Sequence, residues 1–252
     1  MMTASPTLIL LPGWGMAPSS LAPLAAELKA QLTGWVIDCA ALPTLTDDAL
    51  GVWLDELDAR LPENVWLAGW SLGGMLAMAL ADRRGARCPG VITLGSNLSF
   101  VTRHDWGCAL PPATLAAFRA RWASAPEKTR SRFFALVARG SASYSAMIRR
   151  LEAHAVTMTV DQALAGLSLL QCLDLRSQQA RAPCPGLHLF AERDALVPAN
   201  ALDAMAEHLP AASAVHTLPG TGHAFVLERP EACARHMAAF ITQPGTGDAH
   251  EC

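Results

Sequence analysis

Residues 67–75 read LAGWSLGGM, so Ser71 stands between glycines at positions 69 and 73. A G-x-S-x-G pattern holds a nucleophilic serine where a strand turns sharply into a helix, because the residues two places before and after the serine must be small there. The apolar residues 65–68 indicate a strand and residues 72–83 a helix, which puts Ser71 at such a turn. The pattern predicts attack by a serine hydroxyl on a carbonyl carbon; a glycine-rich tight turn without chemistry is the alternative.

A serine nucleophile needs a base to take its proton and a carboxylate to orient that base. The segment FAERDALVP brings Asp194 after one apolar run, and LPGTGHAF brings His223 after the next. Serine, acid and histidine in this chain order, each following a strand, predict a catalytic triad of Ser71, Asp194 and His223. Taken singly, His223 is one of eight histidines, Asp194 also suits a helix cap, and Glu192 or Asp203 competes for its role.

Acyl transfer places negative charge on the former carbonyl oxygen, and two preset N–H groups must meet it. The backbone N–H of Leu72, directly after the serine, is the first expected donor. The second is expected from the loop LLPGWGM, where Trp14 stands between two glycines. We expect the Trp14 backbone N–H to donate and its indole to wall the acyl pocket, whereas an ordinary turn with a packed tryptophan is the simpler alternative.

The elements that must position these residues alternate between short apolar runs and longer helical patterns. Near-continuous apolar runs are typical of parallel strands buried on both faces. They occur at residues 7–11, 35–37, 65–68, 91–94, 187–190 and 214–218. Helices are indicated at residues 20–32, 47–60, 72–83, 198–208 and 230–241, the last two starting at a proline. The alternation predicts an α/β fold with a doubly wound, mostly parallel sheet.

Between Ser96 and Pro185 this alternation stops. Four helical patterns follow one another there without a strand, at residues 112–123, 127–138, 143–154 and 160–172. Such an insertion lies where α/β sheets bind ligands, outside the carboxyl ends of their strands. We therefore expect a core of residues 1–96 and 185–242, a helical lid of residues 97–184 and a disordered tail of residues 243–252.

The expected lid is strongly basic. Residues 101–150 hold nine lysines and arginines against two acidic residues, a net charge of +7, in a chain whose net charge is −3. A basic lid indicates a substrate or partner with several negative charges, because complementary fields steer encounter and fix orientation. An ordinary solvated face rich in arginine is the alternative. Nucleic acid is not expected, since no nucleic-acid motif accompanies the charge.

Composition excludes several classes of function. A net charge of −3 excludes a generally basic protein, and 252 residues with 52% hydrophobic residues suffice for one large core. The seven scattered cysteines form neither a C-x-x-C pair nor a zinc pattern with histidine, so no metal or other cofactor is expected. No cationic leader precedes the first apolar run, and no run approaches about 20 residues. We expect a cytoplasmic monomer without membrane contact.

The motifs LLPGWG, GWSLGG, ERDALVP and GTGHAF, with a helical segment between the second and third, resemble those of the α/β-hydrolase superfamily over almost the whole chain. GSNLSFVTRHDW and SRFFAL are similar to segments of the pimeloyl-[acyl-carrier-protein] methyl ester carboxylesterases of biotin synthesis. The resemblance implies a serine carboxylesterase. It assigns the nucleophile to Ser71, the acid to Asp194, the base to His223 and the oxyanion donors to Trp14 and Leu72.

The same resemblance implies a partner and a substrate. Members of this family use lid arginines to hold the acidic acyl carrier protein and its phosphopantetheine arm, and the candidates here are Arg132, Arg149 and Arg150. The implied reaction releases methanol from a methyl-pimeloyl chain on that carrier. Pro12 departs from the pattern, because relatives commonly carry histidine before the glycine, and this departure bears on the details of the oxyanion loop.

Three alternatives stay open at the level of sequence. A general esterase or thioesterase for small acyl esters would use the same triad. A carbon–carbon bond hydrolase would also need a site for free carboxylates, which the sequence does not disclose. The fold also serves as a non-catalytic ligand receptor, in which a triad survives for binding alone.

Overall fold

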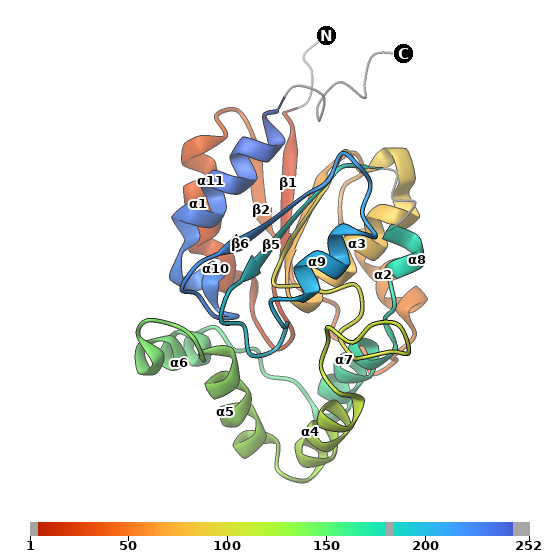
Figure 1. Cartoon of the computed structure of the whole chain (residues 1–252), viewed down its shortest axis with the longest axis vertical. Helices are drawn as coiled ribbons and strands as arrows, with labels where there is room; N and C mark the ends of the chain where they lie inside the picture. Colours follow the sequence, from red (N-terminus) through yellow and green to blue (C-terminus); the bar gives the residue numbers. More distant parts are fainter. Residues whose placement is uncertain (1–4, 180–183, 244–252) are drawn as a thin grey trace.

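The computed structural model describes residues 5–179 and 184–243. Within these residues, six parallel strands form one sheet in the order β2-β1-β3-β4-β5-β6 (Figure 1). The strands are β1 (Thr7–Leu11), β2 (Val36–Cys39), β3 (Trp66–Trp70), β4 (Val91–Leu94), β5 (Gly186–Ala191) and β6 (Ala214–Leu218). The chain runs outward from β1 to β2 and then returns to β3 on the other side of β1. Ligands bind at such a reversal of strand order, so the carboxyl ends of β1 and β3 are the expected site.

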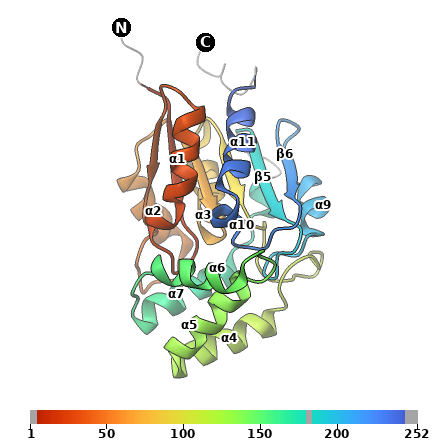
Figure 2. The same cartoon turned by 90° about the vertical axis from the view of Figure 1, so that its left-hand side faces the viewer.

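Helices cover both faces of the sheet, as the predicted doubly wound fold requires. One face carries α1 (Ala22–Gln31), α10 (Phe225–Glu228) and α11 (Pro230–Ile241), and the other carries α2 (Leu50–Arg60), α3 (Leu72–Arg84), α8 (Arg176–Gln179) and α9 (Ala201–Ala206) (Figures 1 and 2). Short 3-10 turns, η1 (Pro18–Leu21) and η2 (Gly85–Arg87), precede α1 and follow α3. The predicted fold class is confirmed.

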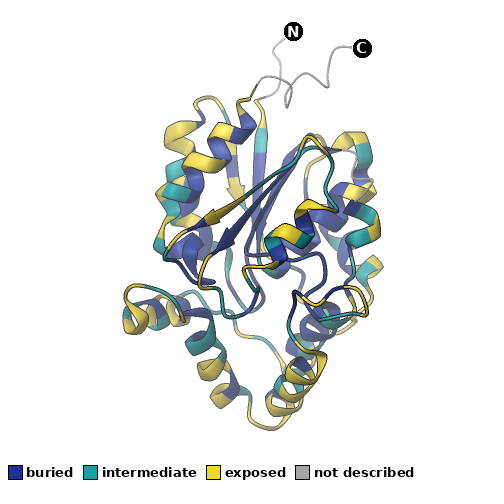
Figure 3. Ribbon diagram, in the orientation of Figure 1, coloured by how far each residue is buried: buried dark blue, intermediate teal, exposed yellow. Residues whose placement is uncertain are grey.

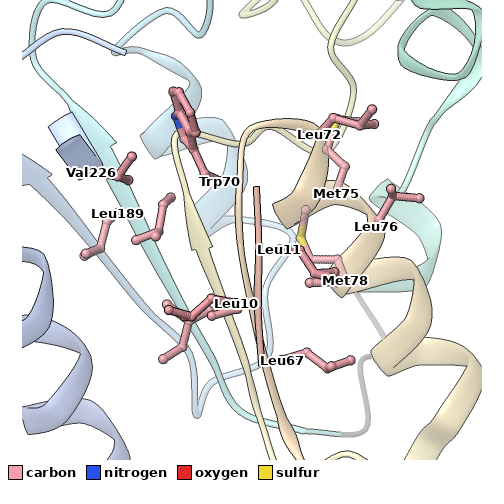
Figure 4. Packing of buried hydrophobic residues seen from close by; sticks show 14 of the residues in the cluster. Leu10, Leu11, Leu67, Trp70, Leu72, Met75, Leu76, Met78, Leu189 and Val226 are labelled. Atoms are coloured by element: carbon pink, nitrogen blue, oxygen red, sulfur yellow. The ribbon is translucent and has the colours of Figure 1, made fainter. Parts of the chain in front are cut away.

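The core is centred on β3, β4, β5 and α3. All residues of these three strands are buried, which accounts for their nearly continuous apolar sequences (Figure 3). Helix α3 is buried along most of its length, and its residues Leu72, Met75 and Leu76 lie on the opposite side of the strands from Trp70 and Val226 (Figure 4). A helix that is apolar on nearly every side must be enclosed. Helix α3, which begins directly after Ser71, is therefore enclosed by the core.

The helix predicted at residues 198–208 is wrong at its start. Helix α9 begins at Ala201, because the backbone N–H of Ala201 donates to the Pro198 carbonyl at 2.9 Å and residues 198–201 form a turn. Helices α8 and α10 were not predicted. Each has four residues, which is too short for a helical repeat of apolar positions to show in the sequence.

Four helices leave the core between β4 and β5. They are α4 (Pro112–Ser124), α5 (Pro126–Val137), α6 (Tyr144–Ala153) and α7 (Val160–Cys172), here called the helical insertion. They gather beyond the carboxyl ends of the strands, opposite the two chain termini (Figures 1 and 2). Helix α8, which the sequence placed in the lid, packs against α3 of the core. The predicted tail lies, apart from Gln243, outside the described residues.

Candidate active site

Ser71 forms the sharp turn between β3 and α3. Its backbone has φ 54° and ψ −120°, a conformation that a residue with a side chain rarely adopts. The neighbouring glycines allow it, because a Cβ at Gly69 would lie 2.2 Å from the Gly73 carbonyl carbon and a Cβ at Gly73 would lie 2.3 Å from the Pro12 oxygen. The backbones of β3, α3 and the loop after β1 therefore pack directly against one another around Ser71.

Hydrogen bonds from β4 and the loop after it hold this turn. The Ser71 N–H donates to the Leu94 carbonyl at 2.9 Å, and the Ser96 hydroxyl donates to the Ser71 carbonyl at 2.7 Å. Gly74 is required beside this hydroxyl, since a Cβ there would lie 2.2 Å from Ser96 Oγ. The sequence analysis did not identify Ser96, because a serine just after a strand carries no signal that distinguishes it from an ordinary loop residue.

The structure brings Asp194 and His223 together as predicted. His223 Nδ1 lies 2.7 Å from Asp194 Oδ2, and each side chain is 1% exposed. The other carboxylate oxygen, Asp194 Oδ1, accepts from the N–H groups of Leu196 at 2.8 Å and Val197 at 2.9 Å. The carboxylate therefore caps the following turn and orients the imidazole at the same time. The alternative from the sequence, a helix cap, is not what the carboxylate forms, since the next helix begins only at Ala201.

The two competitors for the acid role lie elsewhere. Glu192 Oε2 accepts from the Gly220 N–H at 2.6 Å, and Asp203 stands on the exposed side of α9. Among the described contacts, neither carboxylate bonds to His223.

The His223 loop is fixed to the strand that carries the serine. Trp70 Nε1 donates to the His223 carbonyl at 3.0 Å, and a Cβ at Gly95 would lie 3.4 Å from the His223 ring. The imidazole thus lies by the carboxyl ends of β3 and β4, the edge of the sheet at which Ser71 follows β3. Within the described residues, no hydrogen bond joins the Ser71 hydroxyl to His223, and in unliganded enzymes this contact commonly tightens only when substrate binds.

The loop after β1 lies against Ser71. A Cβ at Gly13 would lie 3.5 Å from Ser71 Cβ, and residues 13–16 form a turn closed by the Met16 N–H on the Gly13 carbonyl at 3.1 Å. Gly15 has φ 74°, as the third residue of a type II turn requires. Among the described residues, the backbone N–H groups of Trp14 and Leu72 have no acceptor. Both predicted oxyanion donors are therefore available beside the serine.

An apolar cavity of about 70 Å³ opens beside Ser71. The Trp14 indole forms part of its wall, held by its Nε1 donating to the Ala163 carbonyl of α7 at 3.2 Å. The other lining residues are apolar apart from one threonine and come mostly from the helical insertion: Phe100, Leu110, Thr114, Leu115, Phe118, Phe133, Leu136, Leu167, Leu170 and Leu196. A second cavity, of about 220 Å³, shares Trp14 and Phe133 with the first and includes Arg130. An apolar acyl group fits the chemistry of the first cavity.

Two of the nine basic residues predicted for the lid hold it together. Arg103 Nε lies 3.3 Å from Asp174 Oδ2, and an Arg119 guanidinium N–H donates to Ser168 Oγ at 2.6 Å. Within the described part of the chain, the other seven are exposed and form no ion pair: Arg121, Lys128, Arg130, Arg132, Arg139, Arg149 and Arg150. None of Arg132, Arg149 and Arg150 lines either cavity beside Trp14.

Neither a metal centre nor a membrane segment accompanies the site in residues 5–179 and 184–243. The side chains there include no cluster of three or more histidines, cysteines or carboxylates arranged to hold a metal ion. The helices of the same ranges lack the combined length and apolarity that crossing a bilayer takes.

The fold has close counterparts among solved structures. An esterase from Exiguobacterium antarcticum superimposes with a TM-score of 0.81 at 15% identity, covering 96% of this chain and 94% of the esterase. A bromoperoxidase from Bacillus anthracis gives a TM-score of 0.79 at 18% identity, covering 95% and 92% of the two chains. At these identities the likeness concerns the fold alone.

Curated relatives are closer in sequence. A pimeloyl-[acyl-carrier protein] methyl ester esterase from Aromatoleum aromaticum is 32% identical over 91% of this chain and 95% of the relative. The biotin biosynthesis bifunctional protein BioHC of Cellvibrio japonicus is 31% identical over 90% of this chain, which spans only 45% of that longer protein. Residues 8–236 match the model of the alpha/beta hydrolase family. The chain therefore belongs to the alpha/beta hydrolase family and is related in sequence to the pimeloyl-[acyl-carrier protein] methyl ester esterases.

Proposed function

We propose that this chain hydrolyses the methyl ester of pimeloyl-acyl carrier protein with Ser71 as nucleophile, His223 as base and Asp194 as the acid that orients the base. The observation that carries the chemistry is a strained serine turn at the reversal of strand order, beside a histidine bonded to a carboxylate at 2.7 Å. The names of the relatives and the unpaired basic residues of the insertion support the substrate.

The reaction proceeds in two halves. His223 Nε2 takes the Ser71 proton while Ser71 Oγ bonds to the ester carbonyl carbon, and Asp194 stabilises the imidazolium through Nδ1. The backbone N–H groups of Trp14 and Leu72 hold the oxyanion. Methanol leaves with the proton from His223, and water, activated by the same imidazole, then hydrolyses the acyl-enzyme to the free carboxylate and Ser71.

The two parts of the proposed substrate bind to different regions of the molecule, the cavity beside Ser71 and the exposed arginines of the insertion. The pimeloyl chain is apolar between its ends, as the cavity beside Ser71 is, while the carrier protein is acidic and meets the exposed arginines of the insertion. Opposite charges on the two surfaces raise the encounter rate and fix orientation, and salt weakens both effects. Arg132, Arg149 and Arg150 are the proposed contacts with the carrier.

The deciding experiment measures methanol release from methyl pimelate on acyl carrier protein and from the same ester on a simple thiol, with Ser71→Ala as the blank. Replacing Arg132, Arg149 and Arg150 by serine is expected to lower kcat/KM at least about tenfold for the carrier form and less than about twofold for the thiol form. The charge-matched control replaces three exposed arginines of the core, Arg60, Arg83 and Arg235, which lie outside the insertion. Full turnover by Ser71→Ala would overturn the nucleophile.

A general esterase for small acyl esters is the second candidate. One observation favours it: the cavity at Ser71 is about 70 Å³, whereas a protein cavity that holds benzene is about 150 Å³. Equal kcat/KM on the carrier and thiol forms, with no change in the serine triple variant, would select this function and leave the triad assignment intact.

A further inference from the structure

A short segment of the helical insertion pairs with the predicted oxyanion loop. The Val156 N–H donates to the Gly15 carbonyl at 3.0 Å, and the Ala17 N–H donates to the His154 carbonyl at 2.8 Å. Met16 and Ala155 face each other between these bonds as an antiparallel bridge. Residues 154–156, which directly follow α6, therefore form a two-stranded ladder with residues 15–17, although about 140 positions separate them in the sequence.

This loop needs outside support. Gly13 and Gly15 flank Trp14, and glycine restricts the backbone least of all residues, so one internal hydrogen bond, from the Met16 N–H to the Gly13 carbonyl, leaves the turn open to other conformations. An oxyanion donor acts only if it is aimed before the reaction begins, since reorienting it during the reaction raises the barrier. The Val156 bond is made by the residue directly after Trp14, and it fixes the plane of the peptide that joins Gly15 to Met16. The ladder thus restrains the Trp14 backbone from its carboxyl side.

A side-chain contact extends the ladder by one step. His154 Nδ1 lies 3.0 Å from Ser19 Oγ, and Ser19 belongs to the 3-10 turn that follows the loop. The same histidine thus supplies a backbone acceptor to Ala17 and a side-chain partner to Ser19. Neither residue touches the cavity beside Ser71, so the contact acts on chemistry only through the loop.

We propose that residues 154–156 are a positioning element of the oxyanion hole, with His154 as its side-chain anchor, so that the Trp14 N–H is aimed only while the helical insertion is docked on the loop. This inference rests on the proposed esterase chemistry of Ser71. It gives the insertion a task in the chemical step, separate from its charge. Helix α6 ends at Ala153, next to the ladder, and its exposed Arg149 and Arg150 stand on the same helix.

The test compares two substitutions at one position. Val156→Pro removes the N–H that bonds to Gly15, while Val156→Ala keeps it and serves as the matched control. With p-nitrophenyl butyrate as substrate, Val156→Pro is expected to lower kcat about 10- to 100-fold with KM within about twofold. The reason is that the Trp14 N–H bonds to the oxyanion mainly in the transition state, so its misalignment weakens transition-state binding more than substrate binding. Val156→Ala is expected to stay within about twofold of the parent chain.

A second pair keeps the test decisive if the proline variant does not fold. His154→Ala is expected to lower kcat about three- to tenfold at constant KM, and His154→Asn, which offers a polar atom near the Nδ1 position, is expected to restore most of it. Ser19→Ala is expected to match His154→Ala, and the double variant to lose no more than either. The affinity of n-butylboronic acid, which forms a tetrahedral adduct on Ser71, should fall by the same factor as kcat.

The outcomes separate this inference from the proposed function. Complete labelling of Ser71 by a fluorophosphonate, with unchanged kcat and boronic-acid affinity in His154→Ala and Val156→Pro, would overturn the positioning role and leave the esterase standing. A fall in thermal stability without a fall in kcat would mean that the ladder serves folding only. Absence of labelling at Ser71 in the parent chain would overturn the proposed chemistry itself.

Discussion

The arginines of the core and those of the helical insertion differ in whether they meet a carboxylate. At the carboxyl end of α3, Arg83, Arg84 and Arg87 pair with three acidic residues on or just after α2, Asp55, Asp58 and Glu63. From residue 121 to residue 150 the insertion has seven exposed basic residues and one carboxylate, and its described residues form no ion pair there. Local acidic content thus decides whether an arginine holds the fold or stays open to a ligand.

Arg84 shows the first role most fully. Its side chain is completely buried, and its guanidinium donates to Asp58 Oδ1 at 2.7 Å, the Pro62 carbonyl at 2.8 Å and the Leu61 carbonyl at 2.9 Å. One planar guanidinium thus donates both to a carboxylate of α2 and to the carbonyls of the two residues after that helix. Arg132, on the exposed side of α5, has no such partners among the described residues.

Arg84→Met is expected to have the largest effect on stability and tests the difference between the two groups of arginines most directly. The substitution leaves the buried Leu61 carbonyl, the partly buried Pro62 carbonyl and a partly buried carboxylate without a donor, so the free energy of unfolding should fall by about 3 kcal/mol, somewhat less than for a fully buried pair because Asp58 keeps contact with water. Thermal melting should then shift down by about 6 to 12 °C. Arg132→Met is the matched control, with a change below about 0.5 kcal/mol. Equal losses in both variants would remove the distinction between the two regions.

The sequence predicts the core and the placement of Ser71, Asp194 and His223 after three strands for a physical reason. Strands buried on both faces have nearly continuous apolar sequences. Glycine is required at positions 69 and 73, because a Cβ there would lie 2.2 and 2.3 Å from backbone atoms. Both features can therefore be recognised in the sequence. The order of Ser71, Asp194 and His223 then places them at one edge of a parallel sheet. Only two bounds of the predicted helices and strands shift by more than two residues, the starts of α2 and α9.

Other features of the site could not be predicted from the sequence, because they depend on backbone atoms or on contacts between distant segments. The ladder between residues 15–17 and 154–156 uses main-chain groups that every residue type has. The shared use of the Asp194 carboxylate, by a turn and by an imidazole, needs the turn in place first. Nothing in the sequence of the predicted lid distinguishes Arg103, which is paired and precedes the helical insertion, from Arg132, which is exposed.

A buried histidine makes the core, rather than the insertion, sensitive to acid. His188 lies on β5, its Nδ1 is 2.8 Å from Thr93 Oγ1, and burial lowers its pKa from 6.5 to about 3. Between these values the unfolded chain binds a proton that the folded chain does not, so stability should fall as the pH drops below about 6.5, by up to about 1.4 kcal/mol per unit. Urea unfolding at pH 7, 6 and 5 measures this slope.

The matched variant for this slope is His188→Gln, which does not titrate. Its stability should depend less on pH between 7 and 5 than that of the parent chain, even if its stability at pH 7 is lower. An unchanged slope in His188→Gln would assign the acid sensitivity to other groups and remove His188 from the comparison.

The smallest expected effect has the opposite sign and belongs to the insertion. Seven exposed cations within 30 residues repel one another, and no described carboxylate pairs with them, so replacing Arg132, Arg149 and Arg150 by serine should raise the free energy of unfolding by a few tenths of a kcal/mol. The gain should be largest at about 0.01 M salt and should vanish near 1 M, where screening is effective within about 3 Å. Thermal melting at both salt concentrations checks this, with Arg60, Arg83 and Arg235 replaced by serine as the control that loses ion pairs and should not gain stability. A loss of stability in the insertion variant at low salt would show that these arginines hold the fold, as Arg84 does, and are not left free for a partner.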